Sequence, residues 1–288
     1  MSAAARAPAE LPTISIEPTS GWAALRLKDL WEYRELLYFF VWRDVKIRYK
    51  QTLLGAAWAI LQPLTTMLVF TIFFGRLANV GSDGLPYPVF SFAGLLPWTF
   101  FADGLNKGSG SMVSDASLIR RIYFPRLLLP ISSVLGGLVD FAITFLVLLV
   151  LMAFYGVRPT AAIVFLPLMF LIAIGSALGV GMWLAALNVQ FRDIRFIMPF
   201  FVQIWLFVTP VIYPSSRVTA KLASMGLPGW IYGLNPMAGV VEGFRWALLG
   251  VGTRPGTLIL TSTVVMLLLL LSGALYFRRM ERTFADVI

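Results

Sequence analysis

One segment constrains the fold of this chain more than any other, because a cationic stretch runs directly into a long apolar one. Trp42–Pro63 has the sequence WRDVKIRYKQTLLGAAWAILQP, and no charged residue occurs from Gln51 to Gly75. About 20 consecutive apolar residues are enough for a helix that crosses a lipid bilayer. Basic residues beside such a span mark the end that stays in the cytoplasm. The segment therefore predicts an integral membrane protein.

The composition of the whole chain supports that prediction and excludes several kinds of function. The 288 residues are 59% hydrophobic and 13% charged, whereas about a quarter of the residues in a soluble domain are charged. We interpret the net charge of +9 as a topology signal at a bilayer surface, with no nucleic-acid partner. The absence of cysteine and histidine excludes disulfides, thiol nucleophiles, histidine-based acid–base catalysis and a zinc site of the usual kind.

Six apolar segments are predicted to span the membrane, so we expect an all-α membrane domain over residues 51–282. With six spans both termini lie on one side, and the excess of lysine and arginine on that side places it in the cytoplasm. Residues 1–25 and 283–288 are predicted to be cytoplasmic tails, the first of them disordered and without the apolar core of a signal peptide. The six segments are Leu53–Gly75, Tyr87–Leu105, Ile131–Tyr155, Ile163–Leu187, Phe196–Tyr213 and Thr257–Phe277.

Residues 26–50 are predicted to form an amphipathic helix that lies in the cytoplasmic interface of the membrane. Asp29 and Glu32 have the spacing of a capping box, which favours a helix start at that point. Two interpretations stay open: a simple anchor on the membrane surface, or a lever that a cytoplasmic partner pushes. The charged residues singled out near the end of this helix are Arg43, Asp44, Lys46 and Arg48.

A cytoplasmic loop is predicted at residues 106–126, between the second and third spans. Ser114 is placed to cap a short helix that Pro125 ends. The pattern fits an ordinary positively charged loop, but apolar residues at the tip of a cytoplasmic loop also suit a docking surface.

Residues 214–256 form one long external segment, which is rich in aromatic residues. Asn235 before Pro236 favours a helix start and Gly250 favours a helix stop, so a helix is predicted over Pro236–Leu249. Such a helix is too short to cross the bilayer. We interpret it as half of a re-entrant hairpin covered by neighbouring helices. The alternative is an amphipathic helix that lies on the outer surface.

Asp140 is the one charged residue well inside a predicted span, since Asp103 lies two residues from the end of the second. A carboxylate near the middle of a bilayer costs about 3 kcal/mol or more, so it needs water, a partner or a proton. A proton relay needs several titratable groups in series, and the spans offer only these two carboxylates. This favours a structural hydrogen bond to a neighbouring helix over proton coupling.

Polar and aromatic side chains share one face in each of two spans. Amides and hydroxyls that face lipid are unfavourable, so these faces are expected to point at protein or at a wet path. A path without charge suits neutral sugars or amphiphiles better than ions, although plain hydrogen bonding between helices accounts for the pattern equally well. The candidates for lining a path are Trp58, Gln62, Thr65 and Thr66 in the first span, and Gln203, Phe207 and Thr209 in the fifth.

Four segments, taken in order, resemble the permease subunit of type-2 ABC exporters for O-antigen, capsule and teichoic acid precursors. The chain lacks the G-x-x-x-x-G-K-[ST] pattern of a phosphate-binding loop. The resemblance implies a homodimer driven by two copies of a separate ATPase, which binds ATP and Mg, so that no cofactor lies on this chain. The resembling segments are Trp42–Leu64, Leu118–Pro130, Asn188–Pro214 and Leu234–Gly250.

The resemblance also implies roles for particular segments. In such exporters the helix before the first span and the loop before the third touch the ATPase, while the first and fifth spans flank the channel. A subunit of this kind moves a lipid-linked (polyprenyl) glycan across the bacterial plasma membrane and is not itself an enzyme. The residues implied to dock the ATPase are Leu118, Arg120, Arg121, Tyr123, Phe124, Arg192 and Asp193.

Two other classes of membrane protein fit less well. An ion-coupled secondary transporter should carry several ionisable groups within its spans, and the charged residues in the spans of this chain are Asp140 and, near the end of the second span, Asp103. A membrane-embedded enzyme would need a catalytic set that the spans do not supply. An ABC exporter of another amphiphile or lipid is a closer alternative.

Overall fold

The computed structural model describes residues 27–50, 57–251, 256–281 and 284, and every regular element within these ranges is a helix. The predicted all-α class is therefore confirmed. The predicted tails at 1–25 and 283–288 lie outside the described residues, apart from Phe284, as does the start of the first span at 51–56.

Long helices alternate with short ones along the chain. The elements in chain order are α1 (Leu27–Glu32), α2 (Arg34–Tyr49), α3 (Ala57–Phe70), the π-helix η2 (Thr71–Leu77), α4 (Tyr87–Ser114), α5 (Ala116–Arg121), α6 (Leu128–Leu135), α7 (Leu138–Phe154), the 3-10 helix η3 (Ala161–Phe165), α8 (Leu166–Gln190), α9 (Ile194–Val208), α10 (Ser215–Ser224), the 3-10 helix η4 (Gly229–Leu234), α11 (Pro236–Leu249) and α12 (Gly256–Glu281).

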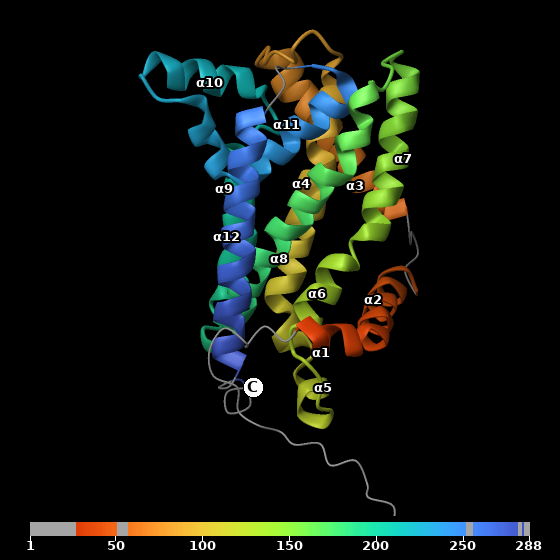
Figure 1. Ribbon diagram of the computed structural model, residues 1–288. Coiled ribbons are helices and arrows are strands. Elements are labelled where there is room, and N and C mark those ends of the chain that lie inside the picture. Colours follow the sequence, from red (N-terminus) through yellow and green to blue (C-terminus); the bar gives the residue numbers. More distant parts are fainter. Residues whose placement is uncertain (1–26, 51–56, 252–255, 282–283, 285–288) are drawn as a thin grey trace, which may run out of the picture.

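The long helices form a bundle, and the short elements gather at its two ends (Figure 1). α1, α2 and α5 lie at one end together with the last turns of α12, and we call this the α5 end. α10 and α11 lie at the opposite end, the α10 end. The predicted topology places 26–50, 106–126 and the C-terminus on one side of the membrane, and the fold brings the described parts of all three to the same end.

Within the described residues, four helical segments are long and apolar enough to cross a membrane: Ala57–Leu77, Leu128–Phe154, Ala161–Gln190 and Gly256–Glu281. They correspond to the first, third, fourth and sixth predicted spans. The helix at the fifth, α9, is shorter, and α4 at the second has a polar second half, DGLNKGSGSMVS. The count of six spans therefore stays a prediction.

The predicted boundary between the second span and the loop at 106–126 was wrong. α4 does not end at Leu105 but continues to Ser114, which is its last residue and caps no further helix. The hydroxyls of Ser109 and Ser111 bond back to carbonyls one turn earlier, which satisfies these polar side chains inside the helix. The loop between α4 and α6 is consequently much shorter than expected, and it includes α5.

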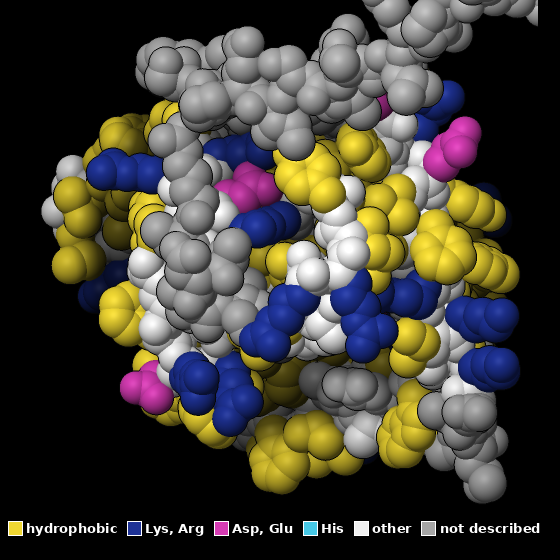
Figure 2. Space-filling view, turned by 90° about the horizontal axis from the view of Figure 1, so that it is seen from below, with side chains coloured by type: hydrophobic (Ala, Val, Ile, Leu, Met, Phe, Trp, Pro, Cys, Tyr) yellow, Lys and Arg dark blue, Asp and Glu magenta, His cyan; other side chains and the backbone are white. Residues whose placement is uncertain are grey.

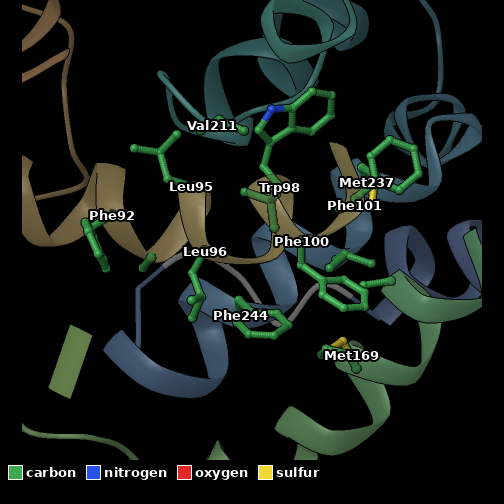
Figure 3. Close-up of a cluster of buried hydrophobic side chains, with 14 of the residues drawn as sticks. Phe92, Leu95, Leu96, Trp98, Phe100, Phe101, Met169, Val211, Met237 and Phe244 are labelled. Carbon is green, nitrogen blue, oxygen red and sulfur yellow. The ribbon is translucent and has the colours of Figure 1, made fainter. Parts of the chain in front are cut away.

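α4 occupies the centre of the bundle, where most of its first half is buried. Aromatic rings on α4 pack against neighbouring helices: Phe101 lies edge-on to Trp205 of α9 at 5.0 Å, and Phe100 lies 4.9 Å from Phe170 of α8. Figure 3 shows Phe92, Leu95, Leu96 and Phe101 of α4 among side chains from several other elements. In its polar second half, Gly108, Ser109 and Ser111 are also buried, so this face of the helix does not meet lipid.

α11 begins at Pro236 and ends at Leu249, as predicted. The Asn235 side chain accepts a hydrogen bond from the backbone of Met237 at 3.1 Å, and Gly250 adopts the left-handed conformation with φ of 69°. Nearly every residue of α11 is buried against α4, α8 and α12. This burial contradicts the alternative of an amphipathic helix on an outer surface.

Close packing of α8 on α12 yields a stability prediction at Gly179. A Cβ at this position would lie 2.7 Å from the backbone of Leu269, whereas a Cβ at Gly181 would meet nothing within 4 Å. We expect Gly179→Ala to destabilise the protein by about 1–3 kcal/mol through overpacking. The matched variant Gly181→Ala is expected to be neutral or slightly stabilising. Thermal unfolding of both variants in detergent tests this, and equal midpoints would contradict it.

Candidate functional site

A cavity of about 560 Å³ lies between α3, α4 and α7, beside the last turn of α2. Three of the predicted path residues, Trp58, Gln62 and Thr66, line it. Thr65 is exposed on another face of α3 and is not part of the lining. The remaining polar and aromatic lining comes from Arg48, Tyr49, Trp98, Thr99, Phe100, Asp103, Asn106, Lys107, Asp140, Phe141 and Thr144.

Most of these α4 residues were not predicted as part of a site. Asn106 and Lys107 belong to the segment interpreted as a loop. They line the cavity because α4 is longer than expected. The signal that could have found them is the spacing of Asp103, Asn106 and Lys107, which puts all three on one face of a continuing helix.

Asp140 has a structural partner, although this lies in α2 and not in a neighbouring span. Its carboxylate forms an ion pair with Arg48 and accepts a hydrogen bond from the hydroxyl of Tyr49. A second pair in the cavity joins Lys107 to Asp103 at 3.5 Å. Each of these cations faces a carboxylate, so the cavity wall combines aromatic rings with charges that are balanced in pairs.

The predicted residues of α9 do not share this cavity. Gln203 and Phe207 lie exposed on the outward face of α9, while Leu206 is the residue of that helix that reaches the lining. Thr209 is fully buried, donates to the Trp205 carbonyl at 2.9 Å and accepts from Asn235 at 3.0 Å. Thr209 thus holds the end of α9 and reaches no open surface of the protomer. It does not line a path in this structure, contrary to the prediction.

At the α5 end, the residues from Asp115 to Arg126, which include α5, form what we call the docking loop. Arg120, Arg121 and Tyr123 are exposed, Tyr123 by 80%, beside a hollow of about 220 Å³. Leu118 is half-buried against the neighbouring cluster. Figure 2, which views this end of the molecule, shows basic side chains distributed among apolar ones. Such a mixed surface suits a protein partner with carboxylates around an apolar pocket.

Phe124 differs from the other predicted docking residues. Its side chain is only 4% exposed and packs edge-on to Phe40 of α2, with ring centres 5.4 Å apart. It therefore joins the docking loop to α2 and presents no surface of its own. Arg192 and Asp193 are exposed at the turn between α8 and α9, but neither lines the hollow.

Arg43 forms the second link between α2 and the docking loop. Its two terminal nitrogens each donate to one oxygen of Asp115 at 2.9 Å, and it also bonds to Asp44. Burial by itself would lower the pKa of Arg43, but the bonds to both carboxylates outweigh it and raise the pKa above its ordinary value. Lys46 is exposed on the same helix. The pairing makes Arg43 a fixed cation that holds two acidic side chains.

The other side of the docking loop is attached to α12. Arg126 donates to the carbonyl of Glu281 at 2.6 Å, and the backbone of Arg126 donates to the Glu281 carboxylate at 3.3 Å. Arg278 forms an ion pair with that carboxylate at 2.8 Å. The loop is thus braced between α2 and α12, which limits its independent movement.

The chain is similar to known proteins over most of its length. Residues 35–249 match the family model described as ABC-2 type transporter. The chain is 34% identical over 220 residues to the O-antigen export system permease protein RfbA of Myxococcus xanthus. The aligned residues cover 76% of this chain and 82% of that protein. It is 28% identical over 258 residues to the O-antigen export system permease protein RfbA of Klebsiella pneumoniae. These residues cover 88% of this chain and 95% of that protein.

A more distant relative acts on a different glycan. The polysialic acid transport protein KpsM of Escherichia coli is 23% identical over 213 residues, which cover 72% of this chain and 78% of that protein. The family match spans the described helices from α2 to α11 and includes both the cavity and the docking loop. The chain is therefore a multi-pass membrane protein that belongs to the ABC-2 type transporter family.

Proposed function

We propose that this chain is the channel-forming subunit of an ATP-driven exporter, which moves a lipid-linked polysaccharide of the O-antigen, capsule or teichoic acid type across the bacterial plasma membrane. The observation that carries the proposal is the similarity to the O-antigen export permease of Myxococcus xanthus, which extends over 82% of that protein. Relatives named for O-antigen and for polysialic acid both match, so the proposal commits to a class of polymer and not to one sugar.

In this proposal two copies of a separate ATPase drive a homodimer of this chain. ATP and Mg bind to the ATPase, and both termini of this chain lie in the cytoplasm. The braced docking loop supports the assignment, because a loop held by Arg43 on one side and Glu281 on the other transmits a push to the helices. Arg192 and Asp193 contribute a second contact to the ATPase.

The glycan passes along α3 and α9, with its polyprenyl tail in lipid. Trp58, Gln62 and Thr66 contact the sugars from the cavity side, and Gln203 and Phe207 face the second copy of the chain. Aromatic rings and amides without net charge support this role, since sugars offer both apolar faces and hydroxyls.

Deletion of the gene tests the proposed function. We expect a lipid-linked glycan to accumulate on the cytoplasmic face of the membrane and to disappear from the cell surface, and we expect the intact gene to restore export. Chemical analysis of the accumulated lipid identifies the substrate. Accumulation of a lipid without sugars would favour the alternative, an exporter of another amphiphile, and unchanged surface glycan would contradict the proposal.

Gln62 provides a sharper test of the path. We expect Gln62→Leu to slow export by roughly fivefold, as for the loss of about 1 kcal/mol of hydrogen bonding. Thr65→Val is the matched control, because Thr65 lies one turn away on α3 but outside the cavity. Export is measured as surface glycan per assembled complex. Equal rates in the two variants would remove Gln62 from the path.

A further inference from the structure

Arg245 is the largest fully buried side chain in the described part of the protein, with 1% exposure in the middle of α11. Its guanidinium donates to four backbone carbonyls, and its central carbon lies 3.6 Å from the centre of the Phe90 ring. No described carboxylate forms an ion pair with it. The carbonyls are those of Phe90 at 3.2 Å, Pro210 at 2.5 Å, Val211 at 2.6 Å and Tyr213 at 3.4 Å.

The surroundings are shaped for a guanidinium. A Cβ on Gly94 of α4 would lie 2.7 Å from a terminal nitrogen of Arg245, so only glycine leaves enough room. The planar fork of arginine can serve several carbonyls at once, whereas the ammonium of lysine is a single point on a flexible stem. A buried cation is costly unless its hydrogen bonds are made. The burial of Arg245 therefore depends on the backbone conformation of the segment that follows α9.

Three of the four carbonyls belong to the segment that directly follows α9. Other hydrogen bonds converge on the same short stretch of chain. The Tyr87 hydroxyl donates to the Ile212 carbonyl at 2.7 Å, and the Tyr232 hydroxyl donates to the Val208 carbonyl at 3.0 Å. Trp205 donates to Asn235 at 3.0 Å. This end of α9 is consequently fastened to α4, η4 and α11.

The opposite end of α9 is much less restrained within the protomer. It starts at Ile194, after a turn that is exposed at the α5 end. Phe196 and Phe200 are 67% and 65% exposed, and α9 makes few contacts with other helices apart from α4 and α8. The two ends of one helix thus differ sharply in how firmly they are held.

We propose that Arg245 is a positioning residue that makes the α10 end of α9 a fixed pivot. The displacement that the ATPase delivers at the α5 end then swings the start of α9 and leaves its far end in place. The inference rests on the proposed function, in which α9 flanks the path of the glycan. It goes further by assigning a moving end and a stationary end to that helix and by naming the residue responsible.

Spin labels at the two ends of α9 test this pivot. The chain has no cysteine of its own, so Ile197→Cys and Val208→Cys each provide a single labelling site, with matched native exposures of 54% and 52%. In the complete complex with the ATPase in lipid nanodiscs, adding ATP and orthovanadate is expected to change the spectrum at position 197 and to leave position 208 unchanged. In the wild-type background, a spectral change at position 208 as large as that at position 197 would by itself overturn the pivot.

Variants of Arg245 extend the test beyond stability. Arg245→Gln is expected to make the label at 208 sensitive to nucleotide and to reduce export at least tenfold, with Arg245→Lys intermediate. Gly94→Ala should act in the same direction by displacing the guanidinium. If Arg245→Gln does not assemble, Tyr87→Phe removes one hydroxyl from the same attachment and carries the test. The contrary result is that the variants lower only the melting temperature and leave the label at position 208 unresponsive to nucleotide. That result would give Arg245 a purely structural role and refute the proposal.

The outcomes distinguish this inference from the proposed function. A wild-type complex that exports glycan while both labels respond equally refutes the pivot and leaves the exporter intact. If no complex with an ATPase forms and surface glycan is unaffected by deletion, the proposed function fails and the inference fails with it.

Discussion

Reversing the charge at Arg120 and Arg121 together is expected to separate this permease from its ATPase and to abolish export. Both side chains are exposed beside the hollow of the docking loop, where a partner must supply carboxylates to complement these two arginines. Arg120→Glu with Arg121→Glu places like charges against those carboxylates, which costs on the order of several kcal/mol. Copurification of the ATPase with the tagged permease measures the loss directly.

A matched control is available at the other end of the molecule. Arg217→Glu with Lys221→Glu also reverses two exposed charges, but on α10, far from the docking loop (Figure 1). We expect this variant to retain the ATPase. If the α5-end variant retains it as well, with export unchanged, the docking surface has been assigned to the wrong residues.

Local signals explain why α11 could be predicted to the residue. Asn235 caps the first turn with its own side chain, and Gly250 takes a backbone conformation that other residues avoid. Both signals act within a few residues of the boundary that they define. No information about the rest of the fold is needed to use them.

The end of α4 and the role of Thr209 depended on distant contacts and could not be predicted in the same way. The polar second half of α4 stays helical because Gly104 and Gly108 pack against Val134 of α6, a partner that local sequence does not reveal. The hydroxyl of Thr209 has the same appearance in the sequence whether it lines a path or bonds to Asn235. Asp140 was expected to need a partner, but Arg48 and Tyr49 come from the helix before the first span.

The charged link between the docking loop and α2 is one bidentate ion pair, and this makes the two interpretations of α2 separable. A surface anchor needs only the exposed apolar side chains of α2, such as Trp42 and Ile47. A lever also needs a firm connection to the loop, and the link from Arg43 to Asp115 supplies its charged part beside the packing of Phe124 on Phe40. Breaking that link while preserving the docking residues therefore tests the lever and spares the anchor.

Arg43→Asp is expected to lower export about tenfold or more while the ATPase still copurifies. The variant loses two charge-assisted hydrogen bonds to Asp115 and two to Asp44. Such a bond contributes up to about 1.5–3 kcal/mol, and less where solvent screens it as at these partly exposed sites. The new side chain also sets a third carboxylate beside Asp44 and Asp115. The exchanged pair Arg43→Asp with Asp115→Arg restores opposite charges and should recover part of the export. The rate of ATP hydrolysis is measured together with export. We expect ATP hydrolysis to continue without transport, which would show that the two are uncoupled. Export at the wild-type rate in Arg43→Asp would leave α2 as an anchor only.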